Sequence, residues 1–145
     1  MKSLDFKDPF YSLWLMPEDS EPFQTWINEH NQHVFPPHLT IVTKFYEKDL
    51  KQNMFEAIKP LLLIPRRLHF ADSITMTLFV EFCLDVQLWN LRNHALDELR
   101  IKDNERPFNP HLSLFYGELN FNDYKLKKSL YDKKLPEKVR FNKIW

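Results

Sequence analysis

A five-residue motif occurs twice in this chain and constrains its fold more than any other feature. The first copy is Pro37-His38-Leu39-Thr40-Ile41, and the second is Pro110-His111-Leu112-Ser113-Leu114, so the histidines are 111 − 38 = 73 residues apart. Each copy lies among apolar, β-branched or aromatic residues, which favour an extended strand. Residues two apart in a strand point to the same face, so each histidine should project beside the hydroxyl of its own copy. The repetition predicts two similar strands, each carrying an imidazole next to a hydroxyl.

The elements around the two copies repeat in the same order. Apolar spacing, turn residues and prolines predict strand 10–16, helix about 20–30, motif strand 38–45, helix about 49–61 and strand 66–70, then strand 74–84, helix 86–100, motif strand 111–116, helix 123–131 and strand 139–145. Both halves read strand, helix, motif strand, helix, strand, which indicates a weak internal duplication. We therefore expect one α+β domain over residues 1–145, with lobes at about 9–71 and 72–145 and one motif on each wall of a shared cleft.

The bulk composition is that of a globular domain and gives no indication of a nucleic-acid-binding or membrane-binding protein. The 145 residues are 43% hydrophobic and 28% charged, as in a globular domain with a real core. Twenty basic and twenty acidic residues cancel, so the chain as a whole gives no sign of affinity for nucleic acid or membranes. Any anionic ligand must be recognised by a local site. We expect no stable nucleic-acid partner.

The single cysteine and the N-terminus bear on the compartment. Cys83 excludes an internal disulfide and, because it lies in an apolar run, is expected to be a buried structural thiol. The first eight residues include acidic side chains and no apolar segment, unlike a signal peptide. No apolar run approaches the roughly 20 residues of a membrane span. We expect a cytoplasmic protein with no membrane partner.

The two motifs together suggest acid/base chemistry on a phosphate. Imidazole changes charge near neutral pH, so two facing histidines can supply one base and one acid in the same turnover. The hydroxyls of Thr40 and Ser113 could hold the non-bridging oxygens of a phosphodiester and stabilise the charge that builds on five-coordinate phosphorus. The scheme requires no metal or cofactor. His38 and His111 are the candidate catalytic pair, and the sequence does not say which is the base.

The chain resembles the 2H phosphoesterase superfamily, whose members carry paired His-x-(Thr/Ser)-x motifs, one in each half of a small duplicated domain. Within that superfamily it is most similar to the small cyclic phosphodiesterase branch. The likeness spans nearly the whole chain and rests on Tyr11-Ser12-Leu13-Trp14-Leu15, Pro37-His38-Leu39-Thr40-Ile41-Val42 and Pro110-His111-Leu112-Ser113-Leu114-Phe115-Tyr116-Gly117-Glu118-Leu119.

The resemblance implies two pseudo-symmetric antiparallel-sheet halves with helices outside and a central cleft. It implies metal-independent hydrolysis of a cyclic phosphodiester, above all a nucleoside 2′,3′-cyclic phosphate, to a 2′-phosphomonoester. His38 and His111 would be the catalytic pair, and Thr40 and Ser113 the phosphate ligands. The substrate would be a small nucleotide or oligonucleotide, and the protein is expected to be a monomer.

Several further residues could line the substrate site. Tyr116 matches an aromatic cleft position of the cyclic phosphodiesterase branch. Strict strand alternation, however, puts Phe115 on the face of His111, so Tyr116 needs a bulge or twist at Gly117 to contribute. Trp14, Phe115 and Tyr116 could stack a base, although most aromatic residues of such a chain must be core. Lys44, six residues after His38 and on the same face, could reach phosphate or be a solvated surface residue.

Other interpretations remain open. Arg66 and Arg67 could form a basic rim or be ordinary surface charge, and His30 and His33 could join His38 in a metal site although no acidic or cysteine partner is fixed nearby. The same catalytic residues would serve a phosphodiesterase that degrades 2′-5′ oligoadenylate or cyclic oligonucleotide signals of antiviral defence. A third possibility is a non-catalytic module that binds a nucleotide or an RNA end.

Overall fold

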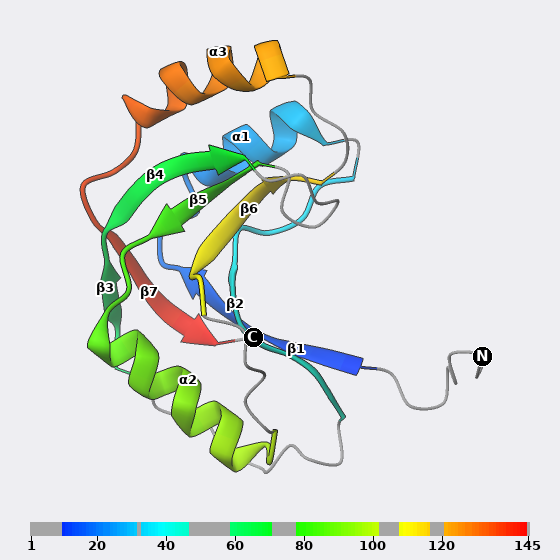
Figure 1. Cartoon of the computed structure of the whole chain (residues 1–145), viewed down its shortest axis with the longest axis vertical. Coiled ribbons are helices and arrows are strands. Elements are labelled where there is room, and N and C mark those ends of the chain that lie inside the picture. The colour runs from blue at the N-terminus through cyan, green and yellow to red at the C-terminus, as the bar shows by residue number, and fades with distance from the viewer. Residues whose placement is uncertain are drawn as a thin grey trace, which may run out of the picture.

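The computed structural model describes residues 10–31, 33–46, 59–70, 78–101, 108–116 and 121–144. Within these ranges the chain has an α+β fold of three helices and seven strands (Figure 1). The helices are α1 (Phe23–His30), α2 (Val86–Glu98) and α3 (Phe121–Asp132). The strands are β1 (Phe10–Pro17), β2 (Leu39–Tyr46), β3 (Leu61–Leu63), β4 (Pro65–Phe70), β5 (Leu78–Phe82), β6 (His111–Phe115) and β7 (Val139–Ile144).

Most elements predicted from the sequence coincide with these helices and strands. The predicted helix at about 49–61 lies largely outside the described residues. Its last position, Leu61, belongs instead to strand β3, which the sequence analysis did not predict. Leu61 and Leu63 are buried while Leu62 is exposed, and the three residues pair with β7. This alternation is that of a strand with one face on the core.

The seven strands form one antiparallel sheet in the order β3-β7-β1-β2-β6-β5-β4. The two motif strands, β2 and β6, are neighbours within it, paired through Leu39 and Leu112. The sheet is strongly curved, with α1 and α3 near one end of the molecule and α2 near the other (Figure 1). The two motif copies are thus brought together by the pairing of strands that are far apart in the sequence.

One row of apolar side chains crosses the sheet and forms the centre of the core. Leu15 pairs with Leu39, Leu39 with Leu112, Leu112 with Val80, and Val80 with Leu68. All five side chains are fully buried, and they belong to the same hydrophobic cluster as residues of α1, α2 and α3. Because side chains alternate along a strand, the residues on either side of this row project from the opposite face of the sheet.

Helix α3 covers the outer edge of the sheet at β4. The backbone N–H of Leu68 donates to Asp132 Oδ1 (2.9 Å), and Lys128 Nζ donates to the carbonyl oxygen of Leu68 (3.2 Å). Lys128 also pairs with Asp132 (2.6 Å), which holds both side chains in place. These contacts satisfy backbone groups that an edge strand would otherwise leave open to pairing with another chain.

Cys83 is exposed, so the prediction of a buried thiol was wrong. All five residues of β5 are buried, but the strand ends at Phe82, one residue before the cysteine. The backbone N–H of Cys83 donates to the carbonyl oxygen of Ile64 (2.9 Å), and its side chain lies outside the core. The apolar run that includes Cys83 extends beyond Phe82, the last residue of the buried strand, so apolar neighbours in the sequence do not indicate burial at this position. Within the described ranges, no helix has the length and apolar character needed to cross a membrane.

Candidate functional site

The pairing of β2 with β6 places the four polar motif residues next to one another. In an antiparallel ladder the numbers of paired residues have a constant sum, here 39 + 112 = 151. The ladder between the two strands consists of this one pair, and its register would set His38 opposite Ser113 and Thr40 opposite His111 if it continued by one residue in each direction. These residues project from the face opposite the buried leucine pair. In this register each histidine has a hydroxyl of its own copy two residues along the chain and faces the hydroxyl residue of the other copy.

Both histidine rings are held by the same backbone hydrogen bond. His38 Nδ1 lies 2.8 Å from the carbonyl oxygen of Pro36, and His111 Nδ1 lies 2.8 Å from that of Asn109, in each case two residues earlier in the chain. A carbonyl oxygen can only accept, so Nδ1 of each ring must carry the hydrogen. In the neutral rings Nε2 then has the lone pair. Each histidine can accept or donate a catalytic proton at this atom.

Aromatic rings surround His38. Trp14 stacks on it with 3.7 Å between ring centroids and an interplanar angle of 17°, and Phe35 approaches edge-on at 6.2 Å. The histidine is only 8% exposed. Burial lowers the pKa of His38, the hydrogen bond from Nδ1 to Pro36 acts in the opposite direction, and the charge of His111 lowers the pKa further. His38 is therefore held in its neutral form near neutral pH.

His111 has different neighbours and is more accessible. The ring of Phe79 packs against it at 5.3 Å, and Glu81 is its cross-strand partner on β5. Glu81 is 6% exposed and receives a hydrogen bond from Arg67 Nε at 2.8 Å. Burial alone would raise the pKa of Glu81, but this hydrogen bond and the charges of Arg67, His69 and Arg66 bring it below its ordinary value. An ion pair between the buried carboxylate of Glu81 and the largely exposed Arg67 thus lies beside His111.

The strands that flank the two motifs are arranged alike. Trp14 on β1 pairs with Thr40, and Phe79 on β5 pairs with Ser113. In both strand pairs the register shifts so that the residue directly after the hydroxyl residue is skipped. Such a bulge turns the rest of the strand and changes which side chains share a face.

The bulge in β6 decides the positions of Phe115 and Tyr116. Phe115 pairs with Leu78 and packs against the core, so strict alternation does not hold along this strand. The ring of Tyr116 lies 4.9 Å from that of Phe35, which in turn contacts His38. A register shift thus falls inside β6, before Tyr116. Gly117, where the sequence predicted a bulge or twist, lies outside the described residues, as does the side chain of Lys44.

A cavity of about 600 Å³ lies between the end of α1, the segment that leads to β2, and the end of β6. Its lining residues are His30, Asn31, His33, Val34, Phe35, Phe115 and Tyr116. His30 and His33 were considered as metal ligands together with His38, but the described part of the chain holds no cluster of three or more His, Cys, Asp or Glu residues suited to a metal ion. Asn31 and Phe35 were not singled out, because their contacts to Leu114 and Tyr116 follow no local pattern.

Arg66 and Arg67 do not form a uniform basic rim. Arg67 pairs with the buried Glu81, so part of its charge is compensated within the sheet. The comparisons add no relative to this picture: neither a known family model nor a curated protein matches this chain.

Proposed function

We propose that this protein is a phosphodiesterase of the 2H type that opens cyclic phosphodiesters, above all nucleoside 2′,3′-cyclic phosphates. The observation that supports this best is the pair of equivalent histidines on neighbouring strands. Each donates its Nδ1 hydrogen to the carbonyl oxygen two residues earlier, and the strands that carry Thr40 and Ser113 pair with each other through Leu39 and Leu112. Two Nε2 atoms and two hydroxyls on one face of a sheet suit in-line displacement at phosphorus.

We also propose that the two halves are related by a pseudo-twofold axis between β2 and β6. The strand order supports this proposal, because β7-β1-β2 on one side of that axis corresponds to β4-β5-β6 on the other. In such an arrangement the last strand of each half pairs with the first strand of the other half. The matching register shifts beside Thr40 and Ser113 support the same relation.

His38 serves as the base in the proposed reaction, because its burial keeps the ring neutral and Nε2 able to accept a proton. It takes a proton from water as the water oxygen bonds to phosphorus. The bond from phosphorus to the ribose 3′ oxygen breaks, and His111, which enters the step as the imidazolium with hydrogens on both ring nitrogens, donates its Nε2 proton to that oxygen. The products are a 2′-phosphomonoester and a free 3′ hydroxyl. Thr40 and Ser113 donate hydrogen bonds to the non-bridging oxygens, whose charge increases in the transition state.

The test is an assay of the EDTA-treated protein against the four nucleoside 2′,3′-cyclic phosphates, 2′-5′ oligoadenylate and several cyclic di- and trinucleotides. We expect hydrolysis of the cyclic monomers. Preference for an oligonucleotide would assign the same residues to the degradation of a nucleotide signal. Binding without turnover across the panel would contradict the proposal and indicate a nucleotide-binding module.

Variants then test the residue roles. His38→Ala and His111→Ala should each lower kcat by orders of magnitude with the fold retained, as checked by circular dichroism. Thr40→Ala and Ser113→Ala should cost roughly 10²–10³ in kcat, as does the loss of one oxyanion donor elsewhere. His94→Ala, a change at an exposed histidine of α2, is the control and should leave kcat unaltered. Near-normal turnover by either motif histidine variant would refute the two-imidazole scheme.

A further inference from the structure

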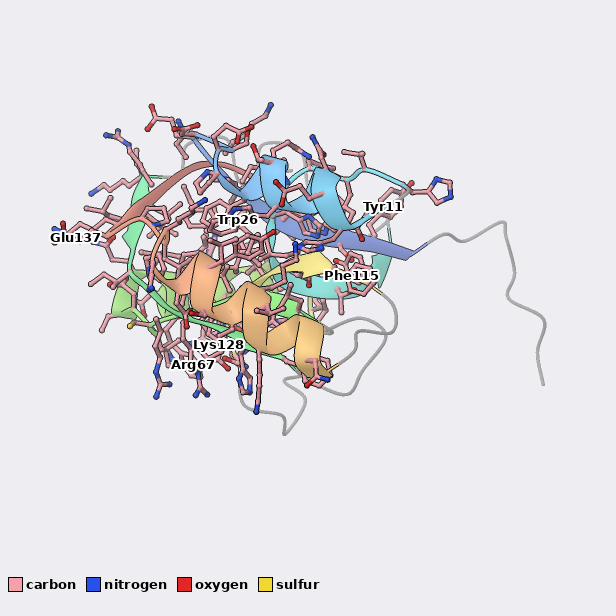
Figure 2. All side chains as sticks on the ribbon, turned by 90° about the horizontal axis from the view of Figure 1, so that it is seen from above. Tyr11, Trp26, Arg67, Phe115, Lys128 and Glu137 are labelled. Atoms are coloured by element: carbon pink, nitrogen blue, oxygen red, sulfur yellow. The ribbon has the colours of Figure 1, made fainter. Side chains whose placement is uncertain are left out.

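The cavity at the end of β6 has the size and lining of a small-molecule site. Its volume of about 600 Å³ lies within the range of roughly 300–1,000 Å³ found for ligand pockets. Three aromatic residues contribute to its walls: Phe35, Phe115 and Tyr116. Figure 2 shows Phe115 at the end of β6 beside α1, and the two elements are in contact. Tyr116 remains 38% exposed, so its ring is accessible from solvent.

Phe35 lies both at the cavity and beside His38, on the face of the sheet that carries the two motif histidines. The ring of Phe35 lies 6.2 Å from that of His38 and 4.9 Å from that of Tyr116. Phe35 therefore lines the cavity and is at the same time a neighbour of the His38 ring. A ligand with a phosphate at His38 could place a flat ring attached to its ribose against Tyr116 and Phe35.

A chain of hydrogen bonds fixes the state of His30, which also lines the cavity. The hydroxyl of Tyr131 donates to Glu29 Oε2 (2.8 Å), and its oxygen lies 2.9 Å from His30 Nε2. Because the one hydroxyl hydrogen goes to the carboxylate, the tyrosine oxygen accepts from His30 Nε2–H. In the neutral ring, Nδ1 is then the acceptor.

Burial keeps these groups in the states that the chain requires. It lowers the pKa of His30, and the charge of Lys127 lowers the pKa further while that of Glu29 opposes it. Burial and the bond to Glu29 raise the pKa of Tyr131, which is fully buried and stacked on Trp26. His30 thus remains a neutral acceptor at the cavity.

Asn31 fixes the remaining wall. Its side-chain nitrogen donates to the carbonyl oxygens of Ile27 (2.7 Å) and Leu114 (2.8 Å), and its side-chain oxygen accepts from the backbone N–H of Tyr116 (3.4 Å). These bonds tie the end of α1 to the end of β6. The cavity is therefore built into the fold before any ligand arrives, which lowers the entropic cost of binding.

We propose that this cavity binds the nucleobase of the nucleotide whose phosphodiester lies between His38 and His111. The base stacks on the ring of Tyr116 at the cavity wall, and a base N–H donates to Nδ1 of His30. The inference rests on the proposed function, since it takes the phosphate to lie between His38 and His111. It makes the protein selective for cyclic phosphates that carry a base over cyclic phosphates of the sugar alone.

The test compares adenosine 2′,3′-cyclic phosphate with methyl riboside 2,3-cyclic phosphate, which has the same reacting group and no base. We expect a lower KM for the nucleotide. Stacking of one base on an aromatic side chain corresponds to roughly a 5- to 150-fold effect. Tyr116→Ala should therefore reduce the ratio of kcat/KM for the two substrates by about that factor. His30→Phe, which keeps a ring but removes the acceptor, should reduce the same ratio by roughly 2- to 12-fold.

Trp89→Ala is the matched control, because Trp89 is 39% exposed and lies on α2, at the other end of the molecule from α1 (Figure 1). It should leave the ratio unchanged. Two results would overturn the base site: equal kcat/KM values for the two substrates in the unaltered protein, or a Tyr116→Ala ratio equal to that of the Trp89→Ala control. In either case, turnover of the substrates would still support the proposed function. Should neither substrate be hydrolysed, calorimetry with adenosine 2′-monophosphate decides: binding weakened by Tyr116→Ala supports the base site, and binding that is absent or unaffected overturns it.

Discussion

Replacing Asn31 by alanine tests whether the link between α1 and β6 stabilises the fold and shapes the cavity. The substitution removes the two hydrogen bonds from the side-chain nitrogen, to the carbonyl oxygens of Ile27 and Leu114. Ile27 keeps a donor, because the backbone N–H of residue 31 also bonds to its carbonyl oxygen (3.1 Å). The carbonyl of Leu114 belongs to a residue with no exposed surface, so water cannot readily replace the lost donor.

The expected loss of stability follows from these two bonds. Each of the two bonds from the side-chain nitrogen contributes about 0.5–1.5 kcal/mol. The bond from the backbone N–H of Tyr116 to the Asn31 side-chain oxygen, at 3.4 Å, is too long to count fully. The free energy of unfolding should therefore fall by about 2 kcal/mol. For 145 residues the entropy of unfolding is roughly 0.3 kcal/mol per kelvin, which converts this loss into a Tm lower by about 7 °C. Urea and thermal unfolding followed by circular dichroism would measure both quantities.

Asn28→Ala is the matched control in the same helix. The Asn28 side chain is exposed and accepts one hydrogen bond from Gln24 (3.0 Å), so its removal should change the free energy of unfolding by less than about 0.5 kcal/mol. If Asn31→Ala were no less stable than Asn28→Ala, the reasoning about the link would be wrong. The Asn31 variant should also discriminate less between adenosine 2′,3′-cyclic phosphate and the base-free probe, because Asn31 holds the backbone of Tyr116.

Two further predictions concern the face of the sheet that carries His38 and His111. The folded state lowers the pKa of His38, so between that value and about 6.5 the unfolded chain binds more protons than the folded chain. The free energy of unfolding should therefore fall as the pH drops through about 6.5. His38 alone contributes at most roughly 1.4 kcal/mol per pH unit to this fall. Urea unfolding at pH 7.5 and 5.5 should show a shallower loss for His38→Gln, and equal slopes would contradict the assignment. Arg67→Ala should destabilise the fold by roughly 1–2 kcal/mol, because it leaves the buried Glu81 carboxylate without its partner, and adding Glu81→Gln should recover part of the loss. A double variant no more stable than Arg67→Ala alone would show that the pair is not the cause.

The sequence predicted the local structure of the motif strands because alternation determines which residues share a face. His38, directly before β2, and Thr40 within it flank the buried Leu39, and His111 and Ser113 flank the buried Leu112 in β6 in the same way. What alternation cannot provide is the pairing of these two strands with each other. That depends on contacts between residues more than 70 positions apart. The meeting of the two motifs was therefore an expectation from repetition, not from any local signal.

The features that the sequence analysis missed depend on register and on long-range contacts. The bulge in β6 directs Phe115 onto the core, and no residue pattern before it indicates a skipped position. The chain from His30 through Tyr131 joins residues 101 positions apart, and the bond from Asn31 to Leu114 spans 83. These contacts build the cavity, so the cavity could not be derived from either segment alone.

The two motif copies supply two histidines with the same backbone hydrogen bond, but the acid/base mechanism that we propose requires two different ones. Both motifs fix Nδ1 with the same carbonyl bond, so this bond cannot decide which ring is the base. The difference comes from the flanking strands: Trp14 covers His38 and keeps it neutral, whereas the partner of His111 across the sheet is the charged Glu81. In the proposed mechanism, residues outside the motif therefore decide which histidine is the base. Exchanging the motif residues between the halves should preserve activity, whereas exchanging the flanking residues should reverse or abolish the assignment.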